Sequence, residues 1–198
     1  MEASNTVTVF DECKITETHV KLYDRKTGEL TKDEASKLGC TGKIEFSPEY
    51  KTIVKNCEGV EEKSTKKLVK LTGKISVHMP LRIARIIFGL TNEGLASGVY
   101  AISDTSCAPN MLLTTKAIDL FTDEEKYMCL PKISFTTGFA KTIDNTAEEI
   151  AEVELEFSAY KDANKKFYYE SIASELDDEI GSKWLKDFDP TMVVAPSK

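Results

Sequence analysis

Acidic side chains are the residues of this sequence whose type and spacing most readily suggest chemistry. Glu152, Glu154 and Glu156 recur at every second position, and Glu45 and Glu49 lie in another alternating segment. If two such segments paired in one sheet, two carboxylates could converge as they do in glycoside hydrolases. Surface carboxylates are common, however, and the plainer interpretation is a solvated acidic stripe along one face of a strand.

The other reactive residues give little support to nucleophilic or metal chemistry. The five cysteines are far apart without a Cys-x-x-Cys pair, and the only histidines are His19 and His78. A catalytic cysteine needs a nearby base, and a zinc site needs several closely spaced ligands. The Thr-Gly-Lys triplets at Thr41 and Thr72 lack the glycine spacing of a phosphate loop. We therefore expect reduced thiols and predict no enzyme, no metal site and no cofactor.

Composition limits the classes of partner. The chain has 198 residues, 41% hydrophobic and 30% charged, which suits one well-buried domain. Its net charge of −7 argues against a general affinity for nucleic-acid backbones, which need clustered lysine and arginine. No segment approaches the roughly 20 apolar residues of a membrane span, and the first residues do not resemble a signal peptide. We expect a soluble protein made in the cytosol, with no membrane partner.

The strands that must position these carboxylates are predicted by a two-residue period. Residues 43–55, 69–79, 132–139 and 151–159 alternate between apolar and polar side chains, so that one face of each strand is buried and the other is wet. The charged segment 56–66, which contains Gly59, predicts a long mobile hairpin loop. The inward positions predict a core of Ile44, Phe46, Tyr50, Val54, Ile75, Val77, Phe135, Val153, Leu155 and Phe157.

Helices are expected at two places. Pro80 suits the first turn of a helix over 80–91, which is apolar almost all round except for Arg82 and Arg85. This helix is expected either to pack on its own sheet or also to contact a neighbouring subunit. A second, short helix is predicted over Thr31–Leu38, where Thr31 and Glu34 form a possible capping box. A turn is predicted at Asp144–Asn145.

The C-terminal residues are predicted to follow a single domain. Residues 1–171 form that domain, and residues 172–198 form a C-terminal arm that contains Trp184, the only tryptophan. An exposed tail rarely holds the only tryptophan of a chain. Trp184 is therefore expected either to fold back on the domain or to anchor the arm on a partner.

The order of these elements resembles that of a known family. An alternating strand begins at Gly42, a charged loop and a second alternating strand lead to Met79–Pro80, and a helix ends in Phe88-Gly89-Leu90. A strand region from Gly98 and the pair 132–139 and 151–159 complete the series. This order is similar to that of the major tail tube protein of long-tailed, siphovirus-type bacteriophages, particularly those of Gram-positive hosts. The similarity covers residues 39–171 and rests on order and spacing rather than on an invariant motif.

The resemblance implies a mainly β fold, a β-sandwich or barrel-forming sheet with one flanking α-helix, an extended loop and terminal arms. It implies hexameric rings that stack into a tube for DNA ejection, with polar strand faces lining the lumen. The lumen-lining candidates are Glu152, Glu154, Glu156, Glu45, Lys43 and Lys74. The ring-stacking candidates are Glu58, Glu61, Glu62 and Lys63, and the subunit-interface candidates are Arg82, Arg85 and Trp184.

The resemblance also implies partners and a location. The chain would assemble with copies of itself in the host cytoplasm and become part of the virion. It would contact tail terminator and tail-tip proteins, enclose the tape measure protein, and let genomic DNA pass without specific binding. Two alternatives remain at this point: a tube or terminator subunit of a contractile tail-like system, or a small-ligand-binding β-barrel with an apolar interior pocket.

Overall fold

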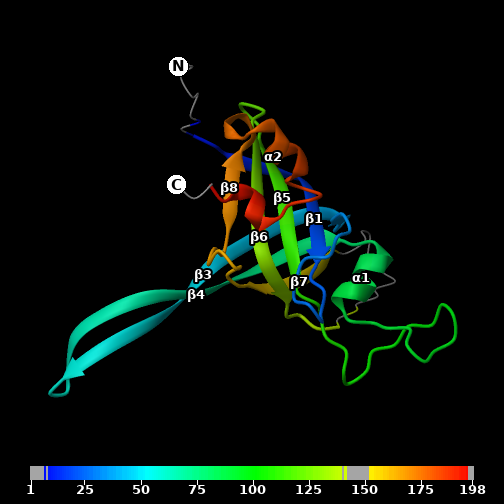
Figure 1. Ribbon diagram of the computed structural model, residues 1–198, viewed down its shortest axis with the longest axis horizontal. Coiled ribbons are helices and arrows are strands. Elements are labelled where there is room, and N and C mark those ends of the chain that lie inside the picture. The colour runs from blue at the N-terminus through cyan, green and yellow to red at the C-terminus, as the bar shows by residue number, and fades with distance from the viewer. Residues whose placement is uncertain (1–6, 8, 140, 142–151, 196–198) are drawn as a thin grey trace, which may run out of the picture.

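Strands dominate the structure, a computed structural model that describes residues 7, 9–139, 141 and 152–195. These residues form one antiparallel sheet of eight strands and two short α-helices (Figure 1), which confirms the prediction of a mainly β fold. The strands are β1 (Glu12–Leu22), β2 (Ser36–Lys37), β3 (Cys40–Cys57), β4 (Val60–His78), β5 (Met111–Asp119), β6 (Glu125–Phe135), β7 (Val153–Ala159) and β8 (Tyr169–Ile172).

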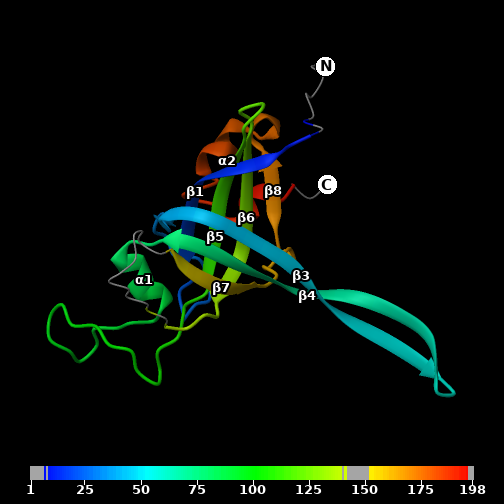
Figure 2. The ribbon, with the colours of Figure 1, turned by 180° about the vertical axis from the view of Figure 1, so that it is seen from behind.

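Strand β6 joins the two halves of the sheet. The strand order is β2-β1-β5-β6-β7-β4-β3, and β8 also pairs with β6. Residues 126–129 of β6 pair with β8, whereas residues 133–135 pair with β7. In both ribbon views, β3, β4 and β7 cross over β5 and β6 (Figures 1 and 2). The sheet therefore bends over itself, and its two halves face each other.

The main core fills the space between these halves. Ile75 and Val77 of β4 and Leu155 and Phe157 of β7 are buried there, as the two-residue period predicts. They meet residues from the other half of the sheet and from the first helix, namely Val20, Met111, Leu113, Leu130, Ile133, Ile83 and Ile87. Of the other predicted core residues, Phe135 is buried, and Ile44, Phe46 and Val153 are partly buried against the same cluster.

The long hairpin of β3 and β4 extends well beyond the rest of the sheet (Figures 1 and 2). The prediction of a loop over 56–66 is wrong, because the strands stay paired up to Cys57 and Val60. Only Glu58 and Gly59 form the turn, with φ values of 50° and 80°, as two-residue hairpin turns require. We call residues 50–57 and 60–68 with this turn the projecting arm.

Two residues predicted for the core lie in the projecting arm instead. Tyr50, which is 54% exposed, and Val54 both stand clear of the main core. Every residue from 50 to 67 is exposed. The alternation of the sequence continues past the point where a second layer covers the strand, and so the period alone overstates the core.

The C-terminal segment covers the outer face of β5, β6 and β8. It forms a 3-10 turn (Ala173–Glu175), helix α2 (Asp178–Lys183) and a second 3-10 turn (Pro190–Val193). Trp184 is only 2% exposed and packs with Phe188, Leu112 and Cys129 in a second core. The described part of 172–198 is therefore a layer of the domain and not a separate arm, and α2 is a helix that the sequence reading missed.

Helix α1 (Leu81–Ile87) is shorter than the predicted 80–91. Pro80 precedes its first turn, where the missing N–H costs nothing, and Gly89, at φ 67°, closes it. Ile83 and Ile87 face the main core. The residues from 88 to 110 then form a long loop, in which the strand region predicted from Gly98 is reduced to a bridge between Thr91 and Ala101.

The helix predicted over Thr31–Leu38 is wrong. This segment is extended, and its short strand β2 pairs with β1. The Leu38 N–H donates to the Thr18 carbonyl at 2.8 Å, and the Ala35 N–H donates to the Lys186 carbonyl at 2.7 Å. Bonds to residues distant in sequence therefore outweigh the local capping pattern. The predicted turn at Asp144–Asn145 lies outside the described residues.

Candidate functional site: the polar face of β3, β4 and β7

Alternate side chains of β3, β4 and β7 form a polar face on the side of these strands away from the main core. The register places Glu45 opposite Lys74 and Lys74 opposite Glu156, so that one row of charges crosses three strands. We call this surface the polar face; its residues are Lys43, Glu45, Ser47, Glu49, Lys70, Thr72, Lys74, Ser76, His78, Glu152, Glu154, Glu156 and Ser158.

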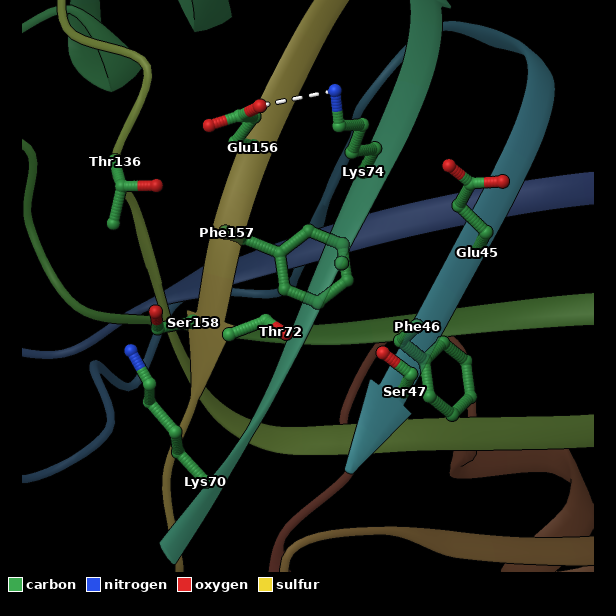
Figure 3. Close-up of a pocket in the computed structure, with 11 residues that line it drawn as sticks. Glu45, Phe46, Ser47, Lys70, Thr72, Lys74, Thr136, Glu156, Phe157 and Ser158 are labelled. Carbon is green, nitrogen blue, oxygen red and sulfur yellow. Dashed lines mark ion pairs between the residues drawn. The ribbon is translucent and has the colours of Figure 1, made fainter. Parts of the chain in front are cut away.

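Lys74 is the central cation of the polar face. Its Nζ atom lies 3.0 Å from the Oε1 atoms of both Glu154 and Glu156, and Figure 3 shows it reaching from β4 toward Glu156 on β7. Hydrogen bonds to Glu156 and Glu154 raise the pKa of Lys74. On β3, Lys43 lies 2.5 Å from Glu45, and the hydrogen bond from Lys43 lowers the pKa of Glu45. The row is therefore charged at neutral pH.

Acidic groups outnumber basic ones on the polar face. Lys70 pairs with Glu49 at 3.3 Å, and His78 Nε2 lies 3.9 Å from Glu152 Oε1. The polar face thus holds five glutamates and three lysines, and each lysine has a carboxylate partner. The face carries a net negative charge while its cations are already engaged, and so it presents carboxylates rather than free cations to solvent.

A groove of about 660 Å³ runs along the polar face (Figure 3). Its polar lining is Glu45, Ser47, Lys70, Thr72, Lys74, Thr136, Glu156 and Ser158. Gly73 forms its floor, where a Cβ atom would lie 2.3 Å from the Glu45 carbonyl and 2.6 Å from Phe157 Cζ. The missing side chain lets the Phe157 ring cross β4 beneath the charges. The groove is open and charged, unlike the enclosed apolar pockets that hold small ligands.

The predicted lumen-lining residues come together on one surface. Glu152, Glu154, Glu156, Glu45, Lys43 and Lys74 all lie on the polar face. The Glu49–Lys70 and His78–Glu152 pairs were not among the predicted candidates. The strand register would have identified both pairs, but the sequence period gives only the face of each residue.

The other candidates lie elsewhere. Glu58, Glu61, Glu62 and Lys63 are at the tip of the projecting arm and are exposed. Arg82 is exposed on α1, whereas the Arg85 guanidinium lies 3.8 Å from the centre of the Tyr100 ring in the chain's own loop. Trp184 is buried in the second core. Its selection as a surface anchor for a neighbouring subunit is therefore wrong for this structure.

Two other kinds of site, a metal centre and a membrane span, find no support among the described residues. Among them, no group of three histidine, cysteine or acidic side chains is placed to hold a metal ion. None of their helices has the length and apolar character needed to cross a membrane. The space between the two halves of the sheet is filled by core side chains, which does not favour the alternative of a ligand-binding barrel.

Comparisons with known proteins add no assignment: no family model and no curated protein matches the sequence.

Proposed function

We propose that this chain is a structural subunit that assembles with copies of itself into a tube, as the tail tube proteins of long-tailed bacteriophages do. The polar face would line the channel, and DNA would pass along it during ejection. The chain would act through its shape and charge, without a catalytic group. A tube of a contractile tail-like system would use the same surfaces. The two candidate functions differ in the particle to which the tube belongs.

The observation that supports this proposal is a charged face on three strands at the end of a sheet. Strand β3 is last in the strand order and pairs only with β4 among the described strands. An edge of this kind is a template for pairing with another chain, and closing the sheets of several copies into one wall removes the edge. In such a wall, the polar faces of all copies would share one side.

The charge of the polar face suits passage of DNA. Its lysines have carboxylate partners, and the remaining charge is negative. A negative lining repels phosphate, and so a duplex would move past it without the cation contacts that hold DNA to a protein. The groove residues Ser47 and Thr72 would keep the same lining hydrated.

Microscopy of the purified chain tests the assembly. We expect rings of one diameter, and tubes of that diameter at higher protein concentration, in negative-stain images. Sedimentation velocity over the same concentrations should show the loss of monomer. A chain that stays monomeric at every concentration, with and without partner tail proteins, would contradict the proposal.

Reversing the glutamate stripe tests the channel. In phage particles that carry Glu152→Lys, Glu154→Lys and Glu156→Lys together, tubes should form while DNA ejection slows or stalls, because the lining would attract phosphate. The matched control reverses three exposed acidic residues in loops: Glu29→Lys, Glu93→Lys and Asp104→Lys. This control should eject DNA at the wild-type rate. Unimpaired DNA ejection by the stripe variant would show that the polar face does not line the channel.

A further inference from the structure

The projecting arm lacks the contacts that normally stabilise a hairpin. It extends about 25 Å, at about 3.3 Å per residue, and its residues 50–67 are all exposed. A lone two-stranded ribbon is marginally stable in water. Its exposed apolar residues include Tyr50, Ile53, Val54 and Val60. Exposed apolar groups on such a ribbon mark a surface that another molecule covers.

Charge indicates what that molecule should carry. On one face of the arm, Lys51 lies opposite Lys67 and Lys55 lies opposite Lys63. Like charges directly opposite each other destabilise a strand pair, and Glu62 relieves only Lys55, at 2.5 Å. The arm holds five lysines and three glutamates, a net charge of +2, and so the other residues carry −9 of the total of −7. An acidic partner would remove this repulsion.

The chain itself has a surface of that kind at another end. In the turn between β5 and β6, Phe121 is 83% exposed, beside the exposed Leu120. Ser174 Oγ donates to Glu124 at 3.0 Å and holds this turn against the C-terminal segment. The turn itself carries Asp123 and Glu124, and the segment that Ser174 begins carries the exposed Glu175, Asp177, Asp178 and Glu179. We call this turn, with residues 174–179, the acidic end.

We infer that the lysine face of the projecting arm docks on the acidic end of a second copy of this chain. The lysine face carries the exposed Ile53 between Lys51 and Lys55, and the acidic end carries the exposed Leu120 and Phe121. The charges of the two surfaces are opposite. The arm and the β5–β6 turn leave the body in different directions (Figure 1), and so they meet only between copies. Two different surfaces that join head to tail build a closed ring or a continuing stack. This inference rests on the self-assembly proposed above.

Charge reversal on each side tests the contact. The arm variant is Lys51→Glu with Lys67→Glu, and the end variant is Glu175→Lys with Asp178→Lys. Each variant alone should lose the assembled species in sedimentation velocity, at protein concentrations where the wild type assembles. The control, Lys161→Glu with Lys166→Glu, makes the same change in charge at exposed positions off the arm and should assemble like the wild type.

Mixing the two variants gives the decisive measurement. In an equimolar mixture, the reversed arm meets a reversed end, and the native arm of the other variant meets a native end. The mixture should therefore restore assemblies in which the variants alternate, while each variant alone stays dissociated. Circular dichroism of each variant, matched to the wild type, shows that folding is retained.

The remaining outcomes overturn the inference in distinct ways. If the arm variant assembles normally, or if the end variant does, these two surfaces do not meet. If both dissociate but the mixture does not recover, the arm docks on another surface. If labelled duplex DNA binds the wild type and not the arm variant, with no effect on assembly, the arm's partner is nucleic acid. If the wild-type protein never assembles, the proposed function is contradicted as well.

Discussion

At the scale of single residues, Gly73 sets how closely the polar face and the core approach each other. Gly73→Ala would place a Cβ atom 2.3 Å from the Glu45 carbonyl and 2.6 Å from the Phe157 ring. The neighbouring strand must then move or the Phe157 ring must turn, and we expect the free energy of unfolding to fall by about 1–3 kcal/mol. Urea denaturation followed by tryptophan fluorescence measures this change.

The control for that substitution lies in α2. Gly181 is a helical glycine with no heavy atom within 4 Å of the position of an added Cβ. Gly181→Ala should raise the free energy of unfolding by up to about 1 kcal/mol, because alanine has less freedom to lose on folding. Equal effects of the two substitutions would show that the close approach at Gly73 does not constrain the sheet.

His19 predicts a pH dependence of stability. It is 4% exposed on β1, and its buried Nδ1 atom has no hydrogen-bond partner among the described residues. Burial lowers its pKa, opposed by Glu17 and assisted by Lys37 and Lys186. The folded chain therefore binds this proton more weakly than the unfolded chain does. The contribution of neutral His19 to the free energy of unfolding is therefore complete above pH about 6.5, and it is lost as the pH falls below that value.

A substitution isolates this contribution. The free energy of unfolding of the wild type should fall between pH 7 and 5 more steeply than that of His19→Gln, by at most about 1.4 kcal/mol per pH unit. Parallel curves for the wild type and His19→Gln would show that His19 does not titrate with folding in this range.

At the scale of elements, an ion pair between the buried Lys21 and the exposed Asp187 fastens the C-terminal segment to β1. Lys21 is 6% exposed, and its Nζ atom donates to Asp187 Oδ1 at 2.7 Å. Asp187→Ala leaves this ammonium buried without a partner, and we expect a loss of about 1–3 kcal/mol in the free energy of unfolding. The double variant Lys21→Met with Asp187→Ala should regain much of that loss, because it removes the buried charge.

The control for this pair is the exposed pair of Glu179 and Lys183 in α2. Glu179→Ala should leave stability unchanged within error, because exposed pairs contribute little. Chemical denaturation of these three variants and the wild type completes the comparison. If the double variant is no more stable than Asp187→Ala, the loss comes from packing of the segment and not from the unpaired lysine.

The elements differ in how far the sequence predicts them. Strands β7 and the inner part of β4 follow a strict two-residue period, and a core covers their apolar faces. The segment 56–66 looks like a loop because both faces of an exposed strand are polar, and no burial pattern marks it. Thr31–Leu38 has a helix-capping pattern, but its partners, Thr18 and Lys186, are distant in the sequence. Local helix propensity does not account for hydrogen bonds to residues that are distant in the sequence.

The candidate site was predicted in its composition and not in its detail. Alternation alone puts Glu154, Glu156 and Lys74 on outward faces. That Lys74 bridges both glutamates follows from the register of β4 against β7, which no local pattern specifies. Trp184 was expected either to fold back on the domain or to anchor the arm on a partner, and the structure shows the first of these, with Trp184 inside the second core. Composition identifies such a residue, and only the tertiary fold assigns the surface that it contacts.

At the scale of the whole molecule, charge and exposed apolar surface are divided between separate ends. The projecting arm is basic, the acidic end is negative, and the polar face lies on the strands that lead into the arm (Figures 1 and 2). A monomer with these features would expose complementary surfaces that cannot meet within one chain. In the proposed tube, the projecting arm of one copy would cover the acidic end of another, and so both surfaces of every copy would be buried.

We therefore expect the projecting arm to be needed for assembly and not for folding of the rest of the domain. Tyr50 and Leu68 lie directly opposite each other, and so replacing residues 51–67 by Asn-Gly closes the hairpin with a favoured two-residue turn. The removed residues are all exposed, and we expect the free energy of unfolding to stay within about 1 kcal/mol of the wild type. The shortened chain should sediment as a monomer at concentrations where we expect the wild type to form tubes. Long tubes built by this variant would show that the arm plays no part in assembly, and an unfolded variant would show that the body depends on it.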